Sequence, residues 1–201
     1  MNKKESGLII FIKNPVAGKV KTRLGATIGD QRALGVYLKL MLHTRTVSLA
    51  VSTNRYLFYD TELNSKDDWN QQDYFKDIQV SGDLGQRMMA AFNSVLTDNN
   101  KAVIIGSDCP EISPEIIQAA FKKLDLADIV IGPTLDGGYY LLGMKEVHTE
   151  LFTDMTWSID SVYNETLARI KKKGLLYTTC PILSDMDNEG DLKKFPDFNV
   201  T

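Results

Sequence analysis

Short runs of apolar residues recur along the chain, separated by longer stretches in which apolar and polar positions follow a helical period. Residues 8–12 are apolar without a break, which is typical of a strand buried on both faces of a parallel sheet. Similar or shorter runs follow at intervals. The strands predicted in this way cover residues 8–12, 56–59, 79–80, 102–106, 128–132, 139–143 and 175–179.

The stretches between these runs predict helices that pack on the sheet. Ser113 followed by Pro114 is a helix start signal. Strands that alternate with helices indicate an α/β fold with a mostly parallel sheet, and we expect residues 1–201 to form a single domain. The predicted helices cover residues 30–50, 84–98, 113–124 and 159–173, with a short further helix from about residue 191. The helix at 30–50 has an apolar stripe of Leu34, Leu38 and Met41, which Tyr37, Leu42 and Leu49 widen. Residues 61–76 are expected to form a surface loop.

Composition narrows the classes of partner. A net charge of −3 provides no global basic field, so we expect no nucleic-acid partner. The run at 8–12 is too short for a signal-peptide core or a membrane span, and no later run approaches membrane length. Cys109 and Cys180 lack metal-ligand spacing, and the two histidines supply little material for a zinc site. We therefore expect a cytoplasmic protein without a transmembrane segment.

A cationic loop follows the first predicted strand. It carries Lys13, Lys19, Lys21 and Arg23 within a segment that also contains Pro15 and Gly18. In an open α/β sheet, ligands bind at the carboxyl ends of the strands. Because the chain as a whole is slightly acidic, this local positive charge predicts a site for a phosphate-bearing ligand.

Acidic residues follow several later strands and should lie at the same edge of the sheet. They are Asp108, Asp136 with Gly137 and Gly138, and the pair Asp185 and Asp187. Each is open to a simpler interpretation as a helix cap or turn former. Carboxylates facing a cationic loop are nevertheless the set that Mg²⁺ or Mn²⁺ and nucleotide phosphates require.

Two common nucleotide-binding motifs are excluded. Residues 15–22 resemble a Walker loop, but the first glycine is missing and Lys19 is followed by valine instead of serine or threonine. Residues 132–138 lack the Gly-x-Gly-x-x-Gly pattern of a dinucleotide site. His43 and His148 lie in no context that suggests nucleophilic catalysis.

Four ordered motifs carry a resemblance to a known family. The chain resembles the small, poorly characterised glycosyltransferase-like proteins of the GT-A, or nucleotide-diphospho-sugar transferase, superfamily, over roughly residues 8–192. The first motif is also similar to that of phospholactate guanylyltransferases, which share the fold but transfer a nucleotide. The motifs are Phe11-x-Lys13-x-Pro15-x-x-Gly18-x-x-Lys21-Thr22-Arg23-Leu24, Gln79-x-x-Gly82-Asp83-Leu84-Gly85-x-Arg87-Met88, Gly106-Ser107-Asp108-Cys109-Pro110 and Gly132-Pro133-x-x-Asp136-Gly137-Gly138-Tyr139-Tyr140.

The resemblance implies a three-layer α/β/α fold and a role for each motif. Asp108 would bind the metal, Mg²⁺ or Mn²⁺, and Asp187 or Asp185 would be the second ligand, although this chain lacks the Thr-Pro pair that follows in related nucleotidyltransferases. Asp136 would be the general base near the acceptor. The nucleotide phosphates would be held by Lys13, Lys21 and Arg23, of which Lys21 and Arg23 would also act in catalysis. The base pocket would be lined by Gln79, Gly82, Leu84 and Gly85, with Arg87 near the base or the phosphates.

Three functions remain open from the sequence. The leading one is metal-dependent transfer of a glycosyl group from a nucleotide sugar to a small acceptor. The second is nucleotidyl transfer from a nucleoside triphosphate to a phosphorylated acceptor, with release of pyrophosphate. The third is a non-catalytic nucleotide-binding protein on the same scaffold. The sequence does not specify the base, the sugar or the acceptor, and it is compatible with a homo-oligomer.

Overall fold

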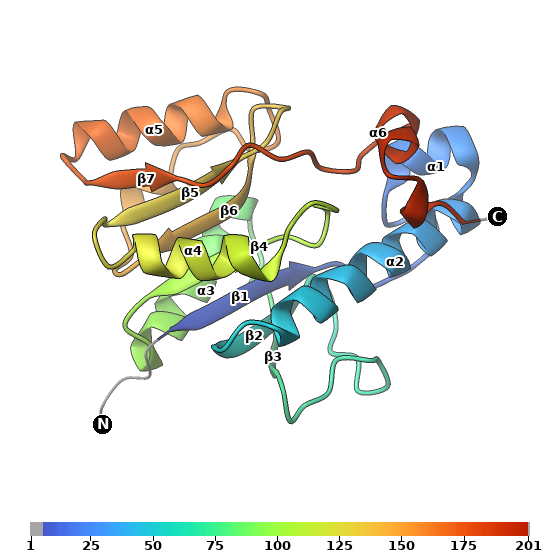
Figure 1. Ribbon diagram of the computed structural model, residues 1–201, viewed down its shortest axis with the longest axis horizontal. Helices are drawn as coiled ribbons and strands as arrows, with labels where there is room; N and C mark the ends of the chain where they lie inside the picture. Colours follow the sequence, from blue (N-terminus) through green and yellow to red (C-terminus); the bar gives the residue numbers. More distant parts are fainter. Residues whose placement is uncertain (1–5, 201) are drawn as a thin grey trace.

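The computed structural model describes residues 6–200, which contain one seven-stranded sheet of order β3-β2-β1-β4-β6-β5-β7 (Figure 1). β6 runs antiparallel to its neighbours β4 and β5, and the remaining pairs are parallel. The mostly parallel sheet confirms the predicted fold class. The strands are β1 (Gly7–Ile12), β2 (Asn54–Tyr59), β3 (Phe75–Ile78), β4 (Ala102–Ile105), β5 (Ile129–Pro133), β6 (Tyr139–Met144) and β7 (Tyr177–Thr179).

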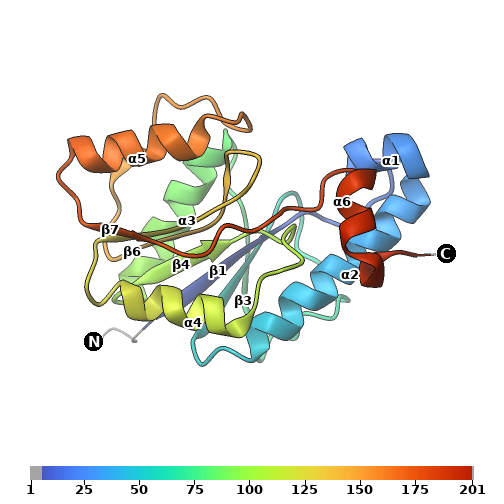
Figure 2. The ribbon, with the colours of Figure 1, turned by 45° about the horizontal axis from the view of Figure 1, so that its top comes forward.

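Helices cover both faces of this sheet, which gives three layers (Figures 1 and 2). α2 and α4 pack on one face, and α3 and α5 pack on the other. The helices are α1 (Thr22–Ile28), α2 (Asp30–Leu49), α3 (Leu84–Asp98), α4 (Pro114–Lys123), α5 (Val162–Lys172) and α6 (Glu189–Lys194), with short 3₁₀ turns η1 (Thr149–Leu151) and η2 (Pro196–Phe198).

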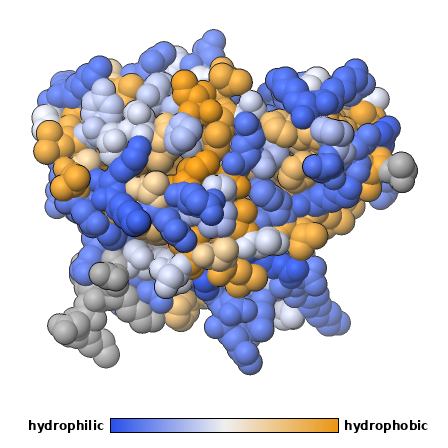
Figure 3. All heavy atoms as spheres, viewed as in Figure 1, coloured by the Kyte–Doolittle hydropathy of each residue, from blue (hydrophilic) through white to orange (hydrophobic). Residues whose placement is uncertain are grey.

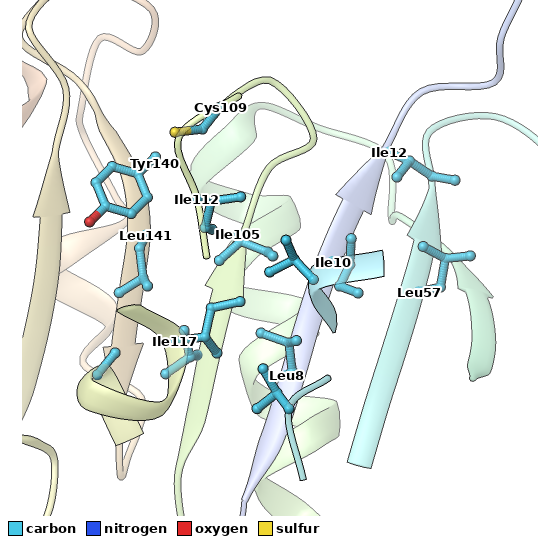
Figure 4. Close-up of a cluster of buried hydrophobic side chains, with 14 of the residues drawn as sticks. Leu8, Ile10, Ile12, Leu57, Ile105, Cys109, Ile112, Ile117, Tyr140 and Leu141 are labelled. Atoms are coloured by element: carbon cyan, nitrogen blue, oxygen red, sulfur yellow. The ribbon is translucent and has the colours of Figure 1, made fainter. Parts of the chain in front are cut away.

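The two cores follow from the alternation of side chains along β1. Leu8 and Ile10 point into the core under α2 and α4, whereas Ile9 points into the core under α3 and α5. All three are fully buried, as the unbroken apolar run predicts. Figure 4 shows Leu8, Ile10 and Ile105 among the side chains of the first core. In Figure 3, the face seen in Figure 1 has hydrophilic residues around its rim and apolar residues near its middle.

A third apolar cluster lies at one end of the molecule. There Leu24 of α1 and Leu40 of α2 pack with Met186 and Leu192 from the segment that follows β7. Figures 1 and 2 both show α6 beside α1. Residues far apart in the sequence are therefore joined next to the cationic loop.

The structure corrects four details of the sequence interpretation. The third strand in chain order is 75–78, four residues before the predicted 79–80. Thr22–Ile28 form α1, for which the sequence pattern predicted no helix and whose first two residues were assigned to the cationic loop. The apolar stripe of α2 is rotated, because Leu38 and Leu42 are exposed while Val36 and Leu40 are buried against the third cluster. The segment at 61–74 is also not purely a surface loop, since it buries the rings of Trp69 and Tyr74. Single-domain organisation stays a prediction.

Candidate active site

A cleft of about 470 Å³ opens at the carboxyl ends of the parallel strands. Because β6 is antiparallel, it reaches this edge with its first residues, so Tyr139 and Tyr140 also line the cleft. The charged side chains of the lining come from several segments of the chain. They are Lys13, Lys21, Arg23, Asp60, Arg87, Asp108, Asp185 and Asp187.

Lys21 forms the central ion pair of the cleft. Its Nζ lies 2.6 Å from Oδ1 of Asp108 and 3.4 Å from Oδ1 of Asp187, and its side chain is only 4% exposed. Asp108 keeps about half of its side chain accessible, so the pair lies at the inner wall of an open cleft. Burial lowers the pKa of Lys21, but the two carboxylates and Asp185 outweigh this and raise it. The ammonium group is therefore held in its charged form.

Backbone hydrogen bonds bring the two acidic loops together. The N–H of Met186 donates to the carbonyl oxygen of Asp108 at 3.0 Å, which ties the segment after β7 to the segment after β4. The N–H of Asp187 donates to Oδ2 of Asp191, and Asn188 and Asp191 form a capping box at the start of α6. This box holds the turn that carries Asp187 against the start of α6.

Asp185 is a carboxyl group of the cluster with a raised pKa. Burial is the main cause that raises its pKa, to about 7, and the negative charges of Asp108 and Asp136 raise it further. Lys21 acts in the opposite direction but does not cancel these effects. Asp108 and Asp187 thus place two negative charges around the buried ammonium group of Lys21, and Asp185 adds a third carboxyl group that is partly protonated near neutral pH.

Arg23 and Lys13 extend the positive side of the cleft. An Nη of Arg23 lies 3.2 Å from Oδ2 of Asp187, and 77% of the Arg23 side chain is exposed. The Lys13 side chain is also exposed at the cleft, while its backbone N–H donates to the hydroxyl of Tyr37 at 2.8 Å. The same hydroxyl lies 3.3 Å from Oγ of Ser107, so Tyr37 links the loops after β1 and β4.

The motif at 79–87 forms the side of the cleft nearest β1 and β2. Gln79 donates through Nε2 to the carbonyl oxygens of Ile12 and Phe58, and its Oε1 accepts a long hydrogen bond of 3.4 Å from Arg87. Arg87 also donates through Nε to the carbonyl oxygen of Gly82. Gln79 is therefore a brace for the strand ends and for Arg87, and the guanidinium group is held at the cleft wall.

The remaining residues of this motif have separate positions. Leu84 is partly exposed and lines the cleft. Gly85 is buried on α3, where an added Cβ would lie 2.3 Å from the carbonyl oxygen of Phe152. Gly82 adopts a φ of +124°, which favours glycine. Gly82 and Gly85 thus shape the backbone and are not among the lining residues.

Asp136 lies in the turn between β5 and β6, close enough to Asp185 to raise the pKa of that residue. Its Oδ1 accepts hydrogen bonds from the Thr134 hydroxyl and from the backbone N–H of Gly138. The Asp136 side chain is exposed beside the cleft and does not line it. One carboxylate oxygen of Asp136 therefore stabilises the turn, in agreement with the simpler interpretation of this residue as a turn former.

The donor set suits a hard divalent cation. Asp108 and Asp187 present carboxylate oxygens to the same point, now taken by Nζ of Lys21, and oxygen ligands are those that Mg²⁺ and Mn²⁺ prefer. Within residues 6–200 no group of three or more His, Cys, Asp or Glu side chains is arranged to hold a metal. The side chains therefore offer the type of ligand atom that such a metal prefers, but phosphate oxygens would be needed to complete its coordination.

Sequence reasoning missed three residues of the site. Tyr37 was interpreted only as part of a helix stripe, because its spacing along the helix gave no reason to distinguish it from the core residues. Ser107 belongs to a recognised motif but received no role. Ser158 lines the cleft with a φ of +63°, and no sequence signal identifies such a backbone position in a residue other than glycine.

Comparison with known protein families identifies the chain. The model of a family described as an uncharacterised protein conserved in bacteria (DUF2064) matches residues 43–159. The chain belongs to this family. Its matched part contains the motifs around Arg87, Asp108 and Asp136, whereas the cationic loop and Asp187 lie outside the matched residues.

Solved structures share the fold. A protein from Desulfovibrio desulfuricans G20, provisionally described as a nucleotide-diphospho-sugar transferase, is 28% identical with a TM-score of 0.86, over 93% of this chain and 84% of that one. An inositol-1-phosphate CTP transferase from T. maritima is 13% identical with a TM-score of 0.62, over 98% and 96%. A manganese complex of Rv0371c from Mycobacterium tuberculosis is 11% identical with a TM-score of 0.57, over 96% and 98%.

Two further searches, one for curated relatives and one for membrane-spanning helices, had negative results. No curated protein matches the sequence. Among the helices that the structure describes, none combines the length and the apolar character needed to cross a bilayer.

Proposed function

We propose that this protein is a metal-dependent transferase that uses a nucleotide-activated donor, and that it passes a glycosyl group from a nucleotide sugar to a small acceptor. The observation that carries the proposal is the contact of Lys21 with Asp108 and Asp187 at the edge of the sheet. A metal–diphosphate unit requires carboxylates to bind the metal and cations to bind the phosphates, and this contact brings both kinds of charge together. The structural neighbour described as a nucleotide-diphospho-sugar transferase supports the same class of donor.

The chain's own cations would bind the diphosphate of the donor. Lys13 and Arg23 present exposed charged groups at the cleft, and the buried Lys21 side chain lines its inner wall. Fixed positive groups stabilise the charge that develops on a departing diphosphate without having to reorganise during the reaction. Leu84 offers an apolar surface for the base, and Arg87, braced by Gln79 and Gly82, offers a donor for the base or the phosphates.

Asp108 and Asp187 would hold Mg²⁺ or Mn²⁺, with Asp185 as the alternative second ligand. When bound, the ion would act as a Lewis acid on the phosphate oxygens of the donor. The manganese complex of a protein with the same fold supports this choice of metal, and the oxygen donors of the site suit either ion.

The charge distribution favours an acceptor without a phosphate group. Apart from Asp187, which pairs with Lys21 and Arg23, the part of the cleft formed by β6 and by the segment after β7 contributes Asp185 and no cation, and Asp136 lies beside it. An anionic acceptor would meet like charges there, whereas a neutral hydroxyl compound would not. Asp136 is our candidate for the general base that accepts the proton of the acceptor hydroxyl, because its recorded hydrogen bonds fall on Oδ1 alone.

Nucleotidyl transfer is the second candidate. It is supported by the fold shared with the inositol-1-phosphate CTP transferase and by the concentration of cations on the loop after β1, which could hold a leaving pyrophosphate. In that reaction the acceptor is itself a phosphate, and the acidic side of the cleft argues against it.

A thermal-shift screen of nucleotides and nucleotide sugars with and without Mg²⁺ or Mn²⁺ tests the proposal, because a ligand that binds the folded state raises its melting temperature. We expect metal-dependent stabilisation by at least one nucleotide sugar, followed by release of a nucleoside diphosphate when an acceptor is supplied. Release of pyrophosphate from a nucleoside triphosphate would favour the second candidate. Stabilisation without any turnover would favour a non-catalytic binding protein.

A further inference from the structure

Lys21 is bound in a way that is unusual for a surface loop. Its side chain is 4% exposed, and its ammonium group lies 2.6 Å from Asp108 and 3.4 Å from Asp187. Its backbone has φ 48° and ψ 43°, the left-handed region that residues with a Cβ rarely adopt. A sterically unfavourable backbone is therefore maintained while the side chain reaches both acidic loops.

The oxygen atoms that hold Lys21 are those that a metal would need. A divalent ion coordinated by Oδ1 of Asp108 would lie roughly 2.1 Å from that oxygen. The Lys21 ammonium group already contacts the same oxygen and also approaches Oδ1 of Asp187. Two cations cannot share this position, because their repulsion and their volumes both forbid it. Binding of the metal thus requires Lys21 to leave.

The phosphates of a donor would give Lys21 its alternative partner. Lys21, Arg23 and Lys13 all line the cleft, so phosphate oxygens placed there would lie within reach of the released ammonium group. Arg23 does not fill the vacated place, since it contacts only the other oxygen of Asp187 and is largely exposed.

We propose that Lys21 is a resident cation that occupies the metal position between Asp108 and Asp187, and that its transfer to the donor phosphates makes metal binding and nucleotide binding depend on each other. The inference rests on the proposed function for the identity of the second ligand. It states that the metal alone binds weakly because it competes with Lys21, and that the nucleotide removes this competition. By thermodynamic linkage, the metal improves nucleotide affinity by the same factor.

Binding of Mn²⁺ alone tests the competition. We would titrate the full chain with Mn²⁺ and measure the free ion by electron paramagnetic resonance, for the wild type and for Lys21→Met, which keeps the unbranched apolar stem of the side chain and removes the ammonium group. We expect Lys21→Met to bind Mn²⁺ about tenfold or more tightly than the wild type, because carboxylate charge is then unopposed. Equal or weaker binding by the variant would overturn the proposal.

Two matched variants separate the position of the charge from its mere presence. Lys19→Met removes a cation from the same loop, but Lys19 is exposed and does not line the cleft, so its Mn²⁺ affinity should equal that of the wild type. Lys21→Arg keeps the charge and should retain weak binding. An equal gain in Lys19→Met would reduce the effect to net charge and would overturn the proposal. Circular dichroism checks each fold, and Lys21→Gln replaces Lys21→Met if the latter does not fold.

The coupling has its own measurement. Adding a nucleoside diphosphate should tighten Mn²⁺ binding in the wild type well beyond the affinity of the free nucleotide for the ion, and it should do so much less in Lys21→Met. If the wild type binds nucleotide and metal but Lys21→Met shows no gain for Mn²⁺ alone, the inference fails and the proposed function stands. If no nucleotide binds, the proposed function fails, while the gain in Mn²⁺ affinity still supports the competition between Lys21 and the metal.

Discussion

The hydroxyl group of Tyr37 accepts a hydrogen bond of 2.8 Å from the backbone N–H of Lys13 and lies 3.1 Å from the carbonyl oxygen of the same residue. One side chain of α2 thus satisfies both backbone groups at the point where β1 becomes the cationic loop. The same hydroxyl lies 3.3 Å from Oγ of Ser107, one residue before Asp108. Tyr37 therefore positions the cationic and the acidic sides of the cleft relative to each other.

Replacing Tyr37 with Phe should loosen this connection. We expect a loss of about 1–2 kcal/mol in the free energy of unfolding, since buried backbone groups lose their partner, and a clear loss of affinity for the nucleotide donor. Urea unfolding and calorimetric titration measure the two effects. Tyr74→Phe is the matched control, because the Tyr74 hydroxyl bonds Ser48 at 2.8 Å and does not line the cleft. A similar affinity loss in both variants would contradict the positioning role.

Asp108→Asn should abolish the part of nucleotide binding that depends on a divalent ion. The amide cannot supply a charged oxygen ligand, although it preserves the shape of the side chain. Because Lys21 is buried but keeps Asp187 as a partner, and Asp108 is about half exposed, the substitution should cost about 1 kcal/mol of stability. Asp125→Asn removes a comparable ion pair, with Lys101 at 2.6 Å, away from the cleft, and should bind nucleotide normally. Unchanged Mn²⁺-dependent calorimetry for Asp108→Asn would refute the metal assignment.

Gly137→Ala should be strongly destabilising. Gly137 has a φ of +89°, and an added Cβ would lie 1.9 Å from the carbonyl oxygen of Asp160. We expect a loss of ~2 kcal/mol or more in the free energy of unfolding. Gly174→Ala is the control, since Gly174 also has a positive φ but faces open space, and should cost only about 1 kcal/mol. Equal losses measured by urea unfolding would mean that the contact with Asp160 is not formed.

The Cys109 thiol should resist alkylation in the folded protein. Burial raises its pKa to about 12, so the reactive thiolate is scarce at pH 8. Iodoacetamide should label it much more slowly in buffer than in urea, as mass spectrometry of the modified chain would record. Equal labelling rates in the two conditions would rule out the buried environment.

The raised pKa of Cys109 also affects the free energy of unfolding at alkaline pH. Between the ordinary thiol pKa of 9.0 and the folded value, the unfolded chain loses this proton while the folded chain retains it. The unfolded state then binds fewer protons, so the free energy of unfolding should fall as the pH rises through this range. Cys109→Ala should remove this contribution from the pH dependence. An unaltered slope in urea unfolding measured at several pH values would contradict the assignment.

Much of the fold could be predicted because its strands and helices are encoded locally. The buried run at 8–12 needs no distant information, and neither does the start signal of Ser113 and Pro114, which the structure confirms at α4. β3 was misplaced because it is a short edge strand in which no residue is buried, so the apolar run that identifies central strands is absent there. The stripe on α2 was misassigned because part of the helix is buried by the segment after β7, which no local pattern predicts.

The candidate site was predicted in its residue types and less well in its contacts. Lys21, Arg23, Asp108 and Asp187 meet, as the shared sheet edge implies. The bond from Met186 to Asp108 and the brace from Gln79 to Arg87 depend on tertiary structure and could not be found from spacing.

The apolar cluster that contains Met186 affects when the site can form. Lys21 and Asp187 are separated by 166 positions in the sequence, and Met186 is buried against helices that are synthesised much earlier. A growing chain that has emerged from the ribosome only as far as β7 already contains every strand of the sheet, yet it lacks one of the two carboxylates that hold Lys21. The candidate site is thus completed only after every strand of its scaffold has been synthesised.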